Sequence, residues 1–153
     1  MHYKKLREVR EDFDMSRKQV AQILEITSQQ YQLYESGKRE MPTHLFIKLA
    51  EYYEVTTDYL VGRSNDDYSD YVSEKQKTLS YYYQKIRDIR EDKDLYQHQV
   101  SDLLGITRQQ YQLYESGKRE MPMHLFIKLA DYYEVTIDYL VGRDKRGLFD
   151  YIE

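Results

Sequence analysis

Residues 29–42 read QQYQLYESGKREMP, and residues 109–122 repeat the same fourteen letters. The likeness extends outward from this stretch: residues 3–63 align with residues 83–143 without a gap, and about 44 of the 61 positions are identical. Self-similarity at a fixed spacing marks an internal duplication. We therefore expect two domains and two connecting segments: a first domain over 1–63, an acidic, tyrosine-containing linker over 64–82, a second domain over 83–143 and a tail over 144–153.

Apolar residues recur at helical spacing in each repeat, and no stretch carries a convincing strand signal. In the first repeat we expect five helices: residues 3–11, residues 17–24, a third ending near Gly37, a fourth opened by Pro42 that carries LFIKLA, and a brief fifth at TTDYLVG. Ser16 followed by Gln19 is a capping-box pattern, and Thr27 followed by Gln30 repeats it at the third helix. The fold class is therefore all-α.

The third helix has two chemically different sides. At 3.6 residues per turn, Tyr31 and Tyr34 lie on one side, which we interpret as core. The other side carries polar, outward residues led by Gln29 and Gln32. Such side chains can hydrogen-bond base edges in a DNA major groove, where glutamine pairs well with adenine.

Composition excludes several other functions. The chain has no cysteine, so disulfides and thiolate metal cages are excluded, and the spacing of its four histidines (His2, His44, His98 and His124) indicates no metal site. We find no nucleophile–base pattern and no glycine-rich phosphate loop, so we expect no enzyme and no cofactor. No apolar run approaches membrane-spanning length, which favours a cytoplasmic protein without a membrane partner. The net charge of −4 means that any nucleic-acid site must be a local basic face.

Each repeat resembles the lambda-repressor/Cro-type helix-turn-helix domain of the Xre family, over about 120 of the 153 residues. The motifs that carry the resemblance are REVRED or RDIRED, SRKQVAQILEIT or YQHQVSDLLGIT, then QQYQLYESGKREMP, HLFIKLA, YYEVT and DYLVG, in this order and twice. The resemblance implies two tandem five-helix lambda-repressor-like domains. It also implies that the third helix of each domain enters the major groove of double-stranded DNA, while the first turn of the second helix contacts a backbone phosphate.

The resemblance assigns expected roles to three sets of residues. The DNA base readers would be Ser28, Gln29, Gln32 and Leu33, with Arg108, Gln109, Gln112 and Leu113 in the second domain. The DNA phosphate contacts would be Arg17, Lys38 and Arg39, with Gln97, Lys118 and Arg119 in the second domain. The structural ion pairs would be Arg10 with Glu35 and Arg90 with Glu115.

The two repeats differ at positions that matter for these roles. Ser28 is replaced by Arg108, and arginine can grip guanine O6 and N7 together, so we expect two related but non-identical half-sites. Glu25 stands at a tight turn where the second repeat has Gly105, which predicts some backbone strain or a slightly different turn in the first domain.

The expected function is a sequence-specific transcriptional regulator, and more specifically a repressor. The alternative is a protein-interaction adaptor or antitoxin-like partner that retains the helix-turn-helix fold. Eighteen tyrosines exceed what two small cores are expected to absorb, which favours a homodimer. No small-molecule effector is evident. The linker can be read as helical or flexible, and the half-sites as direct or inverted.

Overall fold

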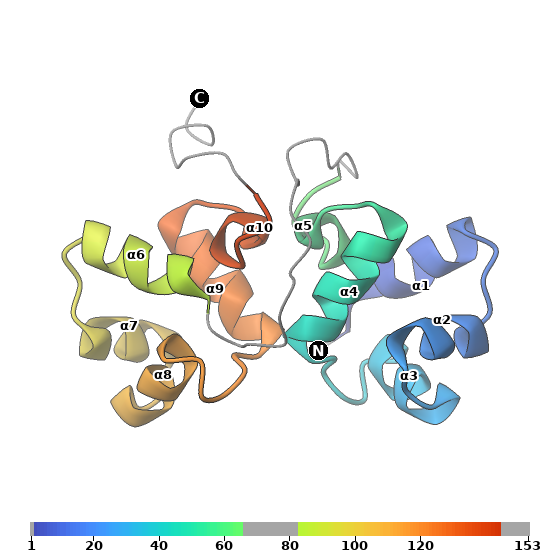
Figure 1. The fold of residues 1–153 in the computed structure, drawn as a ribbon, viewed down its shortest axis with the longest axis horizontal. Helices are drawn as coiled ribbons and strands as arrows, with labels where there is room; N and C mark the ends of the chain where they lie inside the picture. Colours follow the sequence, from blue (N-terminus) through green and yellow to red (C-terminus); the bar gives the residue numbers. More distant parts are fainter. Residues whose placement is uncertain (1, 66–82, 145–153) are drawn as a thin grey trace. The chain divides into compact units, whose positions relative to one another are not determined.

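The computed structural model describes residues 2–65 and 83–144 (Figure 1). The chain divides into two compact units, one within residues 1–69 and the other within 70–153. The predictions for the linker and for the tail fall almost wholly on residues 66–82 and 145–153, which lie outside the described residues.

Within the described residues each unit contains five helices, as predicted, and every helix or strand assigned there is an α-helix. The first unit consists of α1 (Lys4–Asp12), α2 (Arg17–Leu24), α3 (Ser28–Glu35), α4 (Thr43–Tyr53) and α5 (Thr57–Leu60). The second consists of α6 (Gln84–Asp92), α7 (Gln97–Leu104), α8 (Arg108–Glu115), α9 (Met123–Tyr133) and α10 (Ile137–Leu140).

The helices begin at the predicted caps. At the start of α3, the Thr27 hydroxyl accepts from the Gln30 N–H at 3.1 Å, and the Gln30 carbonyl oxygen accepts from the Thr27 N–H at 3.0 Å. Ser16 and Gln19 form the same reciprocal box at α2. At α7, Gln99 accepts from the Tyr96 N–H at 2.7 Å, but the Tyr96 side chain makes no capping hydrogen bond. The second unit thus keeps half of the box.

The core of each unit lies where the central helix, α4 or α9, meets the others. Phe46 and Tyr31 are fully buried in the first unit, and the Tyr3 ring meets Phe46 edge-on at 4.8 Å between centroids. Tyr34 is 8% exposed. The prediction that Tyr31 and Tyr34 face the core is therefore confirmed, and α3 is anchored from beneath by its aromatic side.

The turn between α2 and α3 and its counterpart between α7 and α8 have the same backbone conformation but different residues. Glu25 takes a left-handed conformation with φ 59° and ψ 41°, and Gly105 takes the same conformation with φ 71°. The left-handed conformation destabilises a residue other than glycine by roughly 1–2 kcal/mol, whereas glycine itself loses roughly 0.5–1 kcal/mol through backbone entropy. The left-handed φ and ψ of Glu25 are therefore the source of the expected strain in the first unit.

Replacing Glu25 with glycine is expected to stabilise the first unit by roughly 0.5–1 kcal/mol, the difference between those two costs. The contact of Glu25 with Lys48, 3.9 Å long and largely exposed, contributes little against this. Urea denaturation of the full chain measures the effect. The reciprocal change Gly105→Glu should destabilise the second unit by a similar amount, and a shift of the same sign in both variants would contradict the strain account.

Candidate nucleic-acid interface

The outward face of α3 carries the predicted base readers of the first unit. Gln29 and Gln32 are exposed, while Ser28 and Leu33 are half-buried at the edges of the face. Gln30 between them is occupied by the capping box at Thr27. The structure therefore presents two free glutamine amides on a helix whose opposite side is locked into the core, which is the geometry that readout of base edges requires.

The outward face of α8 repeats this arrangement with one added charge. Gln109 and Gln112 are exposed, Leu113 is half-buried, and Arg108 is exposed at the first position of the helix. The two faces thus share their glutamines and differ at Ser28 against Arg108.

A basic turn follows each of these helices. Lys38 and Arg39 are exposed, and the turn is held by the Arg39 N–H, which donates to the Leu33 carbonyl at 3.1 Å. Gly37 makes the turn possible with a positive φ of 81°. In the second unit, Lys118 and Arg119 occupy the equivalent exposed positions. The residues of the turn that we predict to contact phosphate therefore follow directly on the helix that carries the exposed glutamines in both units.

A buried ion pair ties α1 to the end of α3. The Arg10 guanidinium donates to both carboxylate oxygens of Glu35 at 2.9 Å, and its third contact is the Met15 carbonyl at 2.8 Å. Arg90 and Glu115 form the same two bonds at 2.9 Å in the second unit. The predicted ion pairs are therefore present in both units, and each ties α3 or α8 to the first helix of its unit.

The charge state of Glu35 is set by two opposed effects. Burial is the largest single effect and works to raise the pKa of its carboxyl group, but the hydrogen bonds and positive charges around it, led by those of Arg10, together outweigh burial and hold the pKa below its ordinary value. The same causes lower the pKa of Glu115. Both carboxylates are therefore ionised at neutral pH, as a bidentate pair with arginine requires.

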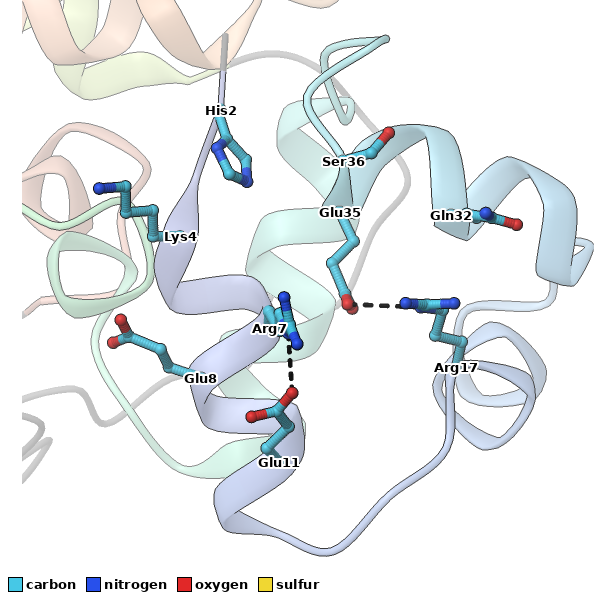
Figure 2. Close-up of a pocket in the computed structure, with 9 residues that line it drawn as sticks. All are labelled: His2, Lys4, Arg7, Glu8, Glu11, Arg17, Gln32, Glu35 and Ser36. Atoms are coloured by element: carbon cyan, nitrogen blue, oxygen red, sulfur yellow. Dashed lines mark hydrogen bonds and ion pairs between the residues drawn. The ribbon is translucent and has the colours of Figure 1, made fainter.

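The predicted phosphate residues at the start of α2 and α7 meet these carboxylates. Arg17 lies 3.5 Å from Glu35, with half of its side chain exposed (Figure 2). Its counterpart Gln97 donates to Glu115 at 3.3 Å and carries no charge. The first residue of α2 is thus a cation, whereas the first residue of α7 is neutral.

Metal-ligand clusters and membrane-spanning helices are both absent from the part of the chain that the structure describes. Within 2–65 and 83–144, no three histidine or acidic side chains converge as metal ligands would. Over the same residues, no helix combines the length and the apolar character that crossing a bilayer requires.

Comparison with known proteins agrees with this geometry. A helix-turn-helix domain model matches residues 3–64, and a second helix-turn-helix model matches residues 86–140. The regulator ImmR of Bacillus subtilis is 30% identical over 85 residues, which cover 56% of this chain and 67% of ImmR. The chain belongs to the Xre-type helix-turn-helix family.

Other relatives align with this helix-turn-helix chain over about the length of one repeat. The transcriptional regulator AnsR of Bacillus subtilis is 36% identical over 62 residues, or 40% of this chain and 53% of AnsR. The cryptic phage CTXphi transcriptional repressor RstR of Vibrio cholerae is 37% identical over 64 residues, or 42% and 58%. The chain thus spans about half the length of these curated relatives. A transcriptional regulator from Listeria innocua, solved by crystallography, aligns with a TM-score of 0.38 and 27% identity over 41% of this chain and 59% of its own.

Sequence reasoning missed two features of this helix-turn-helix chain. Arg63 pairs with Asp58 and closes the end of α5, and Arg143 pairs with Asp138 at 2.6 Å. Arg7 lines the same pocket as Arg17 and Gln32. The signal for the first feature was the Asp-x-x-x-x-Arg spacing in DYLVGR, and the second had no local signal because three helices form the pocket.

Proposed function

We propose that this chain is a sequence-specific double-stranded DNA-binding transcriptional regulator, and that it acts as a repressor in the cytoplasm. Helices α3 and α8 read two related half-sites in the major groove. The observation that carries the proposal is the pair of exposed glutamines on a helix locked from beneath, flanked by a basic turn and present in both units. The names of the relatives, which include a phage transcriptional repressor, support the same function.

The two half-sites differ because the reading faces differ. Arg108 is exposed at the first position of α8, and an exposed guanidinium can form a bidentate contact with guanine. Ser28 at the same place in α3 has one hydroxyl and no charge. We therefore assign a G·C preference to one position of the second half-site, and none to the matching position of the first.

Arg108→Ser is expected to remove that preference, at a cost of about 1–3 kcal/mol in discrimination. The measurement is selection of bound duplexes from a random-sequence library with the full chain and with the variant. The recovered half-sites should become more alike. The reciprocal Ser28→Arg should add a G·C preference to the first half-site. Unchanged preferences in both variants would overturn the assignment of these positions to base readout.

The salt dependence of binding separates this function from the adaptor alternative. A DNA reader loses affinity steeply as salt rises, because counterion release drives binding to phosphates. Failure of the 153-residue chain to bind duplex DNA at low salt would favour a protein-interaction role.

We also propose that the chain forms a homodimer, but the number of tyrosines by itself no longer supports this. Most tyrosines in the described residues are buried, so the two cores absorb more of them than expected. Tyr52 and Tyr132 remain about half exposed on α4 and α9 and are the surface that a second chain could cover.

A further inference from the structure

Two exposed aromatic side chains of the first unit lie against the same buried tyrosine. Phe13, which follows α1, is 48% exposed, and Tyr52, near the end of α4, is 49% exposed. Both rings meet the ring of Tyr53, at 4.7 Å and 5.6 Å between centroids. Large apolar side chains that gather on a surface in this way are typical of an interaction site. We call Phe13, Tyr52 and Tyr53 the aromatic patch.

The residues that flank the aromatic patch in the sequence are acidic. Each member of the patch has a carboxylate next to it in the chain, and most of these side chains are exposed: Asp12, Asp14, Glu51 and Glu54. The lysine of α4, Lys48, lies 3.9 Å from the carboxylate of Glu25, so its charge is offset there. The exposed rings are therefore set in a negatively charged surface.

Two helices also end at the aromatic patch. Helix α1 ends at Asp12, directly before Phe13, and α4 ends at Tyr53, so the contact between the Phe13 and Tyr53 rings brings the two ends together. A helix C-terminus carries a partial negative charge that a nearby cation stabilises. The last turn of α4 has no basic residue, and Arg10 in the last turn of α1 is bound to Glu35. The patch therefore favours a cation that comes from another molecule.

The second unit has a cation of its own at the equivalent place. Lys93 stands where the first unit has Phe13, directly after α6, and it is exposed. The tyrosine pair is kept, because the rings of Tyr132 and Tyr133 lie 5.3 Å apart. The duplicated unit thus carries a lysine at the end of a helix where the first unit presents a ring.

Tyrosine faces in this chain already accept cations. The Lys5 ammonium lies 4.8 Å from the centre of the Tyr59 ring, and Lys85 lies 5.5 Å from that of Tyr139. Arginine is found over aromatic rings more often than lysine, and its planar fork also matches a carboxylate. Exposed rings beside several carboxylates therefore fit an arginine side chain best.

We propose that the aromatic patch docks an arginine-bearing segment of a partner protein, with a guanidinium against Phe13 and Tyr52 and ion pairs to the carboxylates around them. A second copy of this chain is a poorer occupant, because its own matching surfaces carry the same carboxylates and like charges repel at close range. The carboxylates also repel the phosphates of nucleic acid. This assignment leaves the surface around Tyr132, where Lys93 offsets part of the negative charge, for the homodimer proposed above.

The probe is a short synthetic peptide with arginines at alternate positions, titrated into the 153-residue chain at low salt. Binding is followed by the ring resonances of Phe13 and Tyr52. The same peptide with citrulline in place of arginine keeps the shape without the charge and should not bind. Tyr52→Ala should weaken binding of the arginine peptide by roughly two- to fivefold, the effect of one exposed ring. Tyr96→Ala removes a tyrosine that is 69% exposed outside the patch, and it should leave binding unchanged.

The duplication supplies a pair of exchange variants. Phe13→Lys gives the first unit the residue of the second and should weaken binding of the arginine peptide by roughly tenfold, because a ring is lost and a like charge is added. Lys93→Phe makes the reverse change and should create an additional peptide site on the chain, detected as a higher binding stoichiometry. Because this second result is a gain of binding, a folding defect cannot produce it.

A second pair of variants tests the carboxylates. Asp12→Asn and Asp102→Asn each neutralise an exposed acid, the first beside the aromatic patch and the second on α7. Asp12→Asn should weaken binding of the arginine peptide more than Asp102→Asn does, because attraction between exposed charges falls with distance. Equal effects of the two variants would show that the peptide responds only to the net charge of the chain, and the site would be wrong.

Other outcomes would also overturn the proposal. If the citrulline peptide binds as well as the arginine peptide, or if Phe13→Lys behaves like Tyr96→Ala, the aromatic patch does not dock a cationic segment. If Phe13→Lys leaves peptide binding unchanged but turns a dimer into a monomer in sedimentation, a second copy of the chain covers the patch. The experiment contains no DNA, so its result does not depend on the proposed function.

Discussion

Replacing Glu35 with alanine is expected to destabilise the first unit by about 3–5 kcal/mol. The change leaves the buried Arg10 guanidinium without the carboxylate that accepts two of its hydrogen bonds. Urea denaturation, followed by tyrosine fluorescence since the chain has no tryptophan, should show an early transition for the first unit ahead of the second. Glu115→Ala should move the other unit instead.

Two controls identify the cause. Glu11→Gln removes a carboxylate from an exposed pair and should not shift the transition. Replacing Arg10 and Glu35 together with Met and Leu should cost much less than Glu35→Ala, because no buried charge is stranded. If the double replacement is as damaging as the single one, packing rather than charge explains the loss.

The pH dependence of stability provides a second test of the Arg10–Glu35 pair. Because the pKa of Glu35 is lowered in the folded chain, its stabilisation is fully present above the ordinary carboxyl value near 4.5. It is lost as the pH falls from there through the lowered folded pKa. The Glu35→Ala chain should lack this part of the acid sensitivity.

Replacing Gln29, Gln32, Gln109 and Gln112 with alanine is expected to reduce binding of a selected duplex to the level of an unrelated one. Each well-formed glutamine–adenine pair contributes about 1–3 kcal/mol of discrimination, so the variant loses its preference while its phosphate contacts remain. Competition between selected and random duplexes measures this ratio. The side chains are exposed, so the urea midpoint should not change.

Gln22→Ala is the matched control, because Gln22 is an exposed glutamine on α2 outside the reading face. It should preserve the preference for the selected duplex. If the Gln22 variant and the four-glutamine variant lose the same amount, the outward faces of α3 and α8 do not read bases.

Most of the fold could be predicted because its signals are local. The boxes at Ser16 and Thr27 and the glycine at 37 mark helix ends through hydrogen bonds to near neighbours. Burial of Tyr31 follows from helical periodicity alone. The left-handed turn at Glu25 was also predictable, because the duplicated unit has glycine there.

The site was predictable only where one helix makes it. The glutamine face of α3 needs no knowledge of other helices, and the Arg10–Glu35 pair came from the family resemblance. The pocket at Arg7 was missed because its walls come from three helices. In the sequence, Arg7 and Glu11 read as an ordinary pair one helical turn apart, and nothing local indicates that the pair borders a cavity.

The most direct test of the central claim is an NMR titration of the full chain with a selected duplex, followed through the side-chain amides of its glutamines. The account predicts that the amides of Gln29, Gln32, Gln109 and Gln112 shift and are protected, and that those of Gln22 are not. Unchanged resonances for these four, with shifts confined to another surface such as that around Tyr52 and Tyr132, would contradict it.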